Sequence, residues 1–138
     1  SGADECPDCV VTVKTGKLEG RLVGARVRRF LHVPYAADPV GELRFAKPQP
    51  APAWPGVRNA TMNGPGCPQN CELPPHACPA TQSEACLHLN VFAPRAAAVA
   101  KSGPVPVIVF IHGGHFVQGA IDGPLYVSDG FVKRGLVV

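Results

Sequence analysis

The sequence predicts an α/β fold in which a small antiparallel sheet leads into a mixed, mostly parallel central sheet. Residues 10–31 alternate apolar and polar side chains between glycines, which is typical of half-buried strands. Residues 105–111 form a continuous apolar run between turn signals, which is typical of a strand buried on both faces. Another apolar run begins at residues 136–138, and few helices are predicted to cover such a sheet. We therefore expect the fold to be incomplete without a downstream segment or a separate, cleaved chain.

The first half of the chain is predicted to contain short strands followed by a proline-rich segment. Strands are expected over residues 9–13, 18–23 and 25–33, with a turn at residues 14–17, as an antiparallel meander. Six prolines exclude residues 34–58 from the interior of a helix or sheet. This segment is predicted to be an ordered surface wrap, with an interdomain linker as the alternative. Its candidate anchors are Leu43, Phe45, Trp54 and Val57.

The second half alternates loops with short elements. Residues 62–86 hold four of the six cysteines and few apolar side chains, so we expect this loop to be closed by disulfides. Residues 87–93 are predicted to form a strand, and residues 94–104 an Ala/Pro loop. Ser128 or Asp129 is expected to cap a short helix that ends at Arg134.

Composition excludes two classes of partner and favours an oxidising compartment. The net charge of +3 is too small to indicate nucleic-acid binding. No apolar run approaches the roughly 20 residues of a membrane span. Six cysteines in 138 residues, with an N-glycosylation acceptor sequence at Asn59, predict a secreted or extracellular protein.

The segment most clearly linked to chemistry is the strand-to-glycine junction at residues 107–116. Consecutive N–H groups around Gly113 and Gly114 can converge on one point, because glycine permits such a bend. That arrangement suits the negative oxygen of a tetrahedral acyl-transfer intermediate. A plain glycine turn is the alternative. His112 is expected to hold the loop rather than carry a proton.

Five ordered blocks resemble the type-B carboxylesterase/cholinesterase family of α/β-hydrolases, whose N-terminal portion this chain is similar to. The match runs in order from about residue 16 to the end of the chain. The five blocks are Phe30-Leu31-His32-Val33-Pro34-Tyr35-Ala36, Pro39-Val40-Gly41-Glu42-Leu43-Arg44-Phe45, Trp54-Pro55-Gly56-Val57-Arg58-Asn59-Ala60-Thr61, Ser83-Glu84-Ala85-Cys86-Leu87-His88-Leu89-Asn90-Val91 and His112-Gly113-Gly114.

The resemblance implies hydrolysis of a small carboxylic ester by a Ser–His–Glu or Ser–His–Asp triad, without a cofactor or a metal. The serine would stand in a Gly-x-Ser-x-Gly elbow, and the sequence contains none, so nucleophile and base are expected outside this chain. Gly113, Gly114 and His115 would supply the oxyanion hole. The resemblance also implies a Cys67–Cys86 disulfide and a buried or half-buried ion pair between Arg44 and Glu84.

Three positions depart from the family pattern. His115 replaces the third glycine of His-Gly-Gly-Gly, so its ring could swing away, act as an extra proton carrier, or fill the oxyanion hole. Ala85 replaces the signature aspartate. The segment between Cys67 and Cys86 lacks the tryptophan with which cholinesterases hold a quaternary ammonium, which argues against a choline ester.

The four remaining cysteines have less certain partners. Cys71 and Cys78 fall inside the closed loop and are expected to pair. Cys6 and Cys9 are spaced like a redox or zinc pair, but zinc would need a second free cysteine pair, so a local or cross-chain disulfide is favoured.

These observations lead to one preferred function and two alternatives. We expect residues 1–138 to be the N-terminal segment of a single hydrolase domain, with residues 1–15 as an extension. The first alternative is a catalytically inactive cholinesterase-like domain with a structural or adhesion role, motivated by His115 and Ala85. The second is a stand-alone, disulfide-rich binding module.

Overall fold

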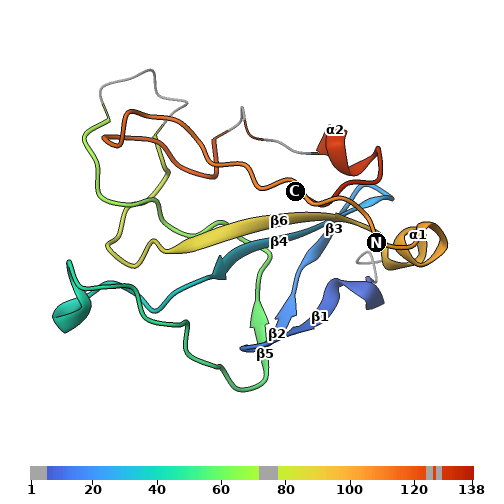
Figure 1. Cartoon of the computed structure of the whole chain (residues 1–138), viewed down its shortest axis with the longest axis horizontal. Coiled ribbons are helices and arrows are strands. Elements are labelled where there is room, and N and C mark those ends of the chain that lie inside the picture. Colours follow the sequence, from blue (N-terminus) through green and yellow to red (C-terminus); the bar gives the residue numbers. More distant parts are fainter. Residues whose placement is uncertain (1–5, 72–77, 124–125, 127–128) are drawn as a thin grey trace, which may run out of the picture.

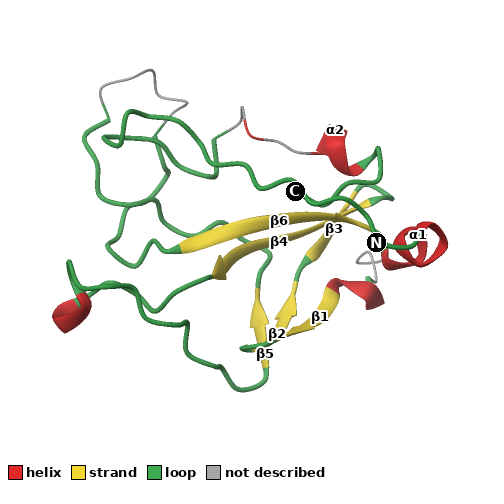
Figure 2. Ribbon diagram, in the orientation of Figure 1, coloured by secondary structure: helices red, strands yellow, loops and turns green. Residues whose placement is uncertain are grey.

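The computed structural model describes residues 6–71, 78–123, 126 and 129–138, and it contains two small sheets beside a long irregular segment (Figure 1). The first sheet has the strand order β1-β2-β5 and the second the order β3-β4-β6. Figure 2 shows that loops occupy most of the remaining chain. The six strands are β1 (Val10–Val13), β2 (Gly16–Glu19), β3 (Arg21–Val23), β4 (Val27–Pro34), β5 (Val57–Asn59) and β6 (His88–Pro94).

The first sheet is a tight hairpin extended by a strand from the proline-rich segment. β1 and β2 pair antiparallel, and β5 joins β2 in parallel. The predicted antiparallel meander of residues 10–31 is only partly correct, because β2 and β3 lie in different sheets. Trp54 locks this hairpin, because its indole N–H donates to the Lys17 carbonyl at 2.8 Å. A Cβ on Gly16 would lie 2.5 Å from the Trp54 ring, so only glycine fits there. The proline-rich segment therefore wraps the hairpin, and Trp54 is its anchor.

The second sheet is antiparallel throughout, and its strands contribute Val27, Phe30, Leu31 and Ala93 to the core. The predicted strand at residues 18–23 is divided at Gly20, where a Cβ would lie 2.4 Å from the Arg29 carbonyl oxygen. β4 pairs with β3 and β6, with an irregularity between Phe30 and Val33. Leu18, Phe30 and Ala60 form the buried cluster between the two sheets.

The predicted interior strand at residues 105–111 is wrong as a regular strand of this structure. Only Val107 makes a β-bridge, in parallel with Val137, while Val138 and Phe92 exchange backbone hydrogen bonds. The reciprocal bonds of the second pair are the antiparallel pattern. The apolar stretch is solvent-exposed, at 83% for Val109 and 85% for Ile111. Its contacts among the described residues are few and include the bridge to Val137 and the Phe110–Tyr126 ring contact, so it runs beside the second sheet as irregular chain.

The predicted Ala/Pro loop at residues 94–104 is also wrong, because it contains helix α1 (Ala96–Ser102). Alanine has the highest helix propensity, and the Asp8 carboxylate accepts the N–H of Ala96 at 2.9 Å, which satisfies a donor of the first turn. Gly103 ends the helix with φ +76°. The second helix, α2 (Asp129–Val132), lies where a helix was predicted but stops short of Arg134. Ser128, the other candidate cap, lies outside the described residues.

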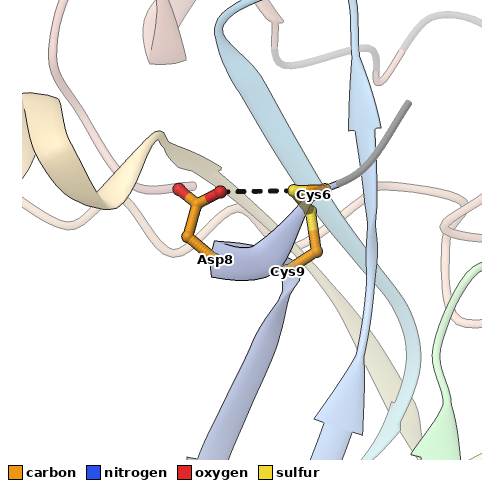
Figure 3. A group of neighbouring side chains, drawn as sticks. All are labelled: Cys6, Asp8 and Cys9. Atoms are coloured by element: carbon orange, nitrogen blue, oxygen red, sulfur yellow. Dashed lines mark hydrogen bonds between the residues drawn. A yellow bond between two sulfur atoms is a disulfide. The ribbon is translucent and has the colours of Figure 1, made fainter.

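A disulfide-closed turn, η1 (Pro7–Cys9), fixes the N-terminal end of the described chain (Figure 3). The Cys6–Cys9 disulfide holds Asp8, whose carboxylate lies 3.0 Å from Arg95 and 3.9 Å from Arg28. Burial opposes ionisation of Asp8, yet the Ala96 amide, Arg95 and Arg28 together hold its pKa below the usual value. Asp8 thus ties the N-terminal turn to β4 and α1.

Two further features complete the fold. A short 3-10 turn, η2 (Gly41–Leu43), lies within the proline-rich wrap. No helix in the described part of the chain combines the length and apolar character that crossing a membrane would require.

Candidate functional site

The glycine pair after the apolar stretch forms a tight, strained turn. The carbonyl of Gly114 accepts hydrogen bonds from the N–H groups of Val117 at 3.1 Å and Gln118 at 3.2 Å. Between them, His115 and Phe116 have φ values of +54° and +60°, which only glycine adopts without cost. A Cβ on Gly114 would lie 1.7 Å from the Gln118 carbonyl oxygen. Glycine is therefore obligatory at position 114, whereas His115 occupies a conformation that a glycine would adopt more easily.

Two backbone donors of this turn make no hydrogen bond with the part of the chain that the structure describes. Among the described residues, the N–H groups of Gly114 and His115 donate no hydrogen bond. The His115 imidazole is exposed. The turn therefore presents two neighbouring amide donors that an incoming acceptor oxygen could use.

His112 lies at the base of the turn. Its Nδ1 is 2.8 Å from the Gly113 carbonyl oxygen, and its ring stacks on Tyr126 with centroids 6.1 Å apart. A Cβ on Gly119 would lie 2.6 Å from His112 Nδ1, so the returning chain also packs against this ring. These contacts are those of a side chain that holds the two ends of the turn.

The disulfide-closed loop docks on the same turn through one glutamine. The Gln69 side chain accepts the N–H of Gly119 at 2.7 Å and donates to its carbonyl at 2.9 Å. The backbone N–H of Gln69 in turn donates to the Gln82 side chain at 2.8 Å. Sequence reasoning missed Gln69, because nothing local distinguishes it from other polar loop residues.

The cysteines form three disulfides in the structure: Cys67–Cys86, Cys71–Cys78 and Cys6–Cys9. The first joins the loop to the residue preceding β6 by two positions and so fixes the loop beside the glycine turn. Cys6, Asp8 and Cys9 bring ligand-type atoms close together, but both sulfurs are bonded to each other, which removes the thiolates a zinc site would need.

Arg44 and Glu84 are brought together as the resemblance implied, through a hydrogen-bonded ion pair. The buried form of that expectation is wrong, because the two side chains are 54% and 41% exposed. Arg44 also lies over the Phe45 ring at 4.7 Å. Solvent screening makes the pair a weak contributor to stability.

A second polar site, which sequence reasoning did not predict, lies between β4, β5 and β6. The rings of His32 and His88 meet edge to face with centroids 4.6 Å apart. His88 is 7% exposed, and its Nδ1 has no hydrogen-bond partner within the described chain. Burial lowers the pKa of both imidazoles, and Arg58 lowers both further, while Asp38 opposes the shift. Sequence reasoning placed the two histidines in or beside predicted strands but gave no sign that these strands would be neighbours.

An apolar cavity of about 240 Å³ lies along the exposed stretch. Its walls come from β6, from the 107–112 segment and from the last residues of the chain. They include Leu89, Val91, Ile108, Phe110, Tyr126 and Val138. The cavity extends along the apolar stretch to the base of the glycine turn, where His112 also lines it.

Known proteins share both the sequence and the fold of this chain. The model of the family described as "Carboxylesterase family" matches residues 7–138. Cholinesterase of Mus musculus is 39% identical over 133 residues, covering 86% of this chain and 21% of that protein. Para-nitrobenzyl esterase of Bacillus subtilis (strain 168) is 39% identical over 137 residues, covering 94% and 26% respectively. Neuroligin-3 of Mus musculus is 34% identical, covering 93% of this chain and 21% of its own length.

A solved structure of PNB esterase superposes with a TM-score of 0.82 at 38% identity, covering 95% of this chain and 27% of that chain. The chain thus spans about a quarter or less of the length of these relatives. The matches agree with the five sequence blocks and with the expectation of a partial α/β-hydrolase fold. The chain belongs to the carboxylesterase family, of which it represents an N-terminal portion.

Proposed function

We propose that this chain is the N-terminal segment of a carboxylic ester hydrolase and supplies backbone donors to its oxyanion hole. The proposal is supported by the N–H groups of Gly114 and His115, which have no acceptor among the described residues and belong to a turn that requires glycine at position 114. Amide donors fixed before the reaction stabilise a developing alkoxide without reorganisation. His112 and Gln69 position the turn rather than react.

The nucleophilic serine and the base belong, in this proposal, to residues outside the chain. No Gly-x-Ser-x-Gly elbow occurs among the 138 residues. The serine would attack the ester carbonyl, and the carbonyl oxygen would move toward the amides of Gly114 and His115 as it gains charge. A third donor would come from the residue after that serine.

The exposed apolar stretch around Val109 and Ile111 supports the proposal that another part of the protein covers this face. Val109 and Ile111 are exposed in a run whose composition suits an interior strand, and the apolar cavity lies beside them. We propose that the remainder of the hydrolase domain, as a downstream segment or a second chain, covers this face. Residues 1–138 would then be one part of a single domain, with residues 1–15 as an extension of which 1–5 lie outside the described residues.

We further propose a secreted or extracellular location. Three disulfides support it, since such bonds persist in oxidising compartments. The acceptor Asn59 lies exposed in the edge strand β5 and its side chain caps the following turn through Thr61. Asn59 is accessible to a glycosyl transferase in this position.

The test uses the complete protein that contains this chain. A serine-directed organophosphate should label it, and it should hydrolyse a p-nitrophenyl ester. Replacing the labelled serine by alanine should abolish both signals. A complete protein with no reactive serine would exclude the enzymatic function.

His115 favours one alternative, a catalytically silent domain. Its side chain stands where the family has glycine, and its φ of +54° is unfavourable for a side-chain-bearing residue. The substitution His115→Gly distinguishes the two functions. If the ring hinders an active site, ester turnover should rise, while an inactive domain should gain only about 1 kcal/mol of stability from relieved strain.

A further inference from the structure

The His32–His88 site lies in a cavity that the ester-hydrolase proposal does not use. The cavity measures about 220 Å³ and is lined by both histidines, Arg58 and Asp38. It is smaller than pockets for drug-sized ligands, so its occupant would be a molecule of a few heavy atoms.

Two of its polar groups lack a protein partner. The half-buried Arg58 makes no ion pair or hydrogen bond with the described residues. Its guanidinium lies over the Trp54 ring, 5.5 Å from the ring centre, as a cation–π contact. His88 Nδ1 is buried and also unpaired within the described chain. A buried polar group without a partner is costly, so His88 would gain from a bound hydrogen-bonding partner. The half-buried Arg58 supplies a positive charge at the same cavity.

The site is rigid and partly apolar. Gly64 packs against both rings, and a Cβ there would lie 2.5 Å from His32 and 2.8 Å from His88. His32 itself has φ +58°, at the point where its own strand, β4, is irregular. The remaining walls are apolar and include Pro34, Pro52 and Leu87.

We propose that this cavity binds a short-chain aliphatic carboxylate. The carboxylate would pair with Arg58 and accept hydrogen bonds from the histidine pair, and its alkyl tail would lie against the proline and leucine walls. Arginine suits a planar carboxylate because its donors form a matching fork. Asp38 is exposed at this site and opposes an anion, but water and salt screen its charge.

The histidines couple binding to protons. An anion beside them favours their charged form, so binding would take up protons. Affinity should therefore increase as the pH falls through the range in which imidazoles titrate.

The experiment is calorimetric titration of the complete protein with butyrate at about pH 6 and about pH 8. Saturable binding is expected, tighter at the lower pH, with shifts of the His32 and His88 NMR signals. Butylamine, with the same alkyl chain and opposite charge, should not bind. None of these readouts involves ester turnover, so failure here leaves the ester-hydrolase proposal untouched.

Two substitutions with opposite expected effects on butyrate affinity distinguish a specific effect on binding from a loss of folding. Arg58→Gln should weaken butyrate about tenfold, while Asp38→Asn should tighten it about threefold at low salt. Arg26→Gln removes the same charge at an exposed turn and should change nothing. Equal binding of butyrate and butylamine would overturn the proposal. So would the absence of butyrate binding, or zinc binding that depends on His88 without any response to butyrate.

Discussion

Residues 6–102 and residues 103–138 differ in where their apolar side chains lie. The first region buries Leu18, Phe30 and Ala60 between its two sheets, whereas Ala120 and Val132 are the only buried apolar side chains among the described residues of the second. Both regions are rich in strand-forming residues. The difference teaches that an apolar run becomes a strand only where a neighbouring strand and a covering layer are present.

The largest effect should come from the core of the first region. Phe30 is 4% exposed, so Phe30→Ala should lower the free energy of unfolding by about 3–5 kcal/mol, through lost burial and a residual cavity. Phe45→Ala is the matched control, since Phe45 is 93% exposed, and should cost about 1 kcal/mol or less. Denaturant unfolding of the complete protein measures both. Equal costs would show that the core does not lie between the two sheets.

A substitution in the glycine turn should show whether the second region contributes to ester hydrolysis. Gly114→Ala places a methyl group 1.7 Å from the Gln118 carbonyl oxygen, so the turn must move and take its two amide donors with it. Loss of one oxyanion donor lowers kcat by about 10²–10³, and we expect a fall of this size for p-nitrophenyl ester hydrolysis.

Gly24→Ala serves as the control for that substitution. Gly24 also has positive φ, at +57°, but a Cβ there meets nothing within 4 Å. It should cost about 1 kcal/mol of stability and leave kcat unchanged. If Gly114→Ala retains full turnover, the amides of this turn are not oxyanion donors.

The pH dependence of stability should separate two sites in the first region. The pKa values of His32 and His88 lie below 6.5 in the folded protein, so between that folded pKa and 6.5 the unfolded chain binds more protons. The contribution of these two histidines to the free energy of unfolding is complete above pH 6.5 and is lost as the pH falls toward their folded pKa values. Asp8, with a lowered pKa, contributes above 3.8 and loses its contribution only as the pH falls through its folded pKa.

Unfolding midpoints measured across this pH range test the assignment. His88→Phe should flatten the decline just below pH 6.5, and Asp8→Asn should flatten only the acid end. His115→Gln, at an exposed site, should alter neither. A decline just below pH 6.5 that survives His88→Phe and His32→Phe together would locate the titrating group elsewhere.

Sequence reasoning succeeded where the signal was local and failed where it depended on distant partners. The strand near residues 87–93 and the need for glycine at position 114 followed from alternation and glycine chemistry, whereas the oxyanion role of this junction stays a prediction. Helix α1 was missed because the prolines at both ends of residues 94–104 favoured a loop over the helix that the run of alanines forms. Its first turn is also capped by Asp8, which is far away in sequence. The His32–His88 contact depends on strand register, which the sequence does not specify.

The smallest effect should come from the Arg44–Glu84 pair, which forms as the resemblance implied but is half-buried rather than buried. Both side chains are about half exposed, so water screens the charges and the pair should contribute about 1 kcal/mol or less. A double-mutant cycle with Arg44→Met and Glu84→Gln measures the coupling in the complete protein. A coupling of several kcal/mol would mean that the remainder of the domain buries this pair, and that the first region, like the second, depends on a covering layer that these residues do not provide.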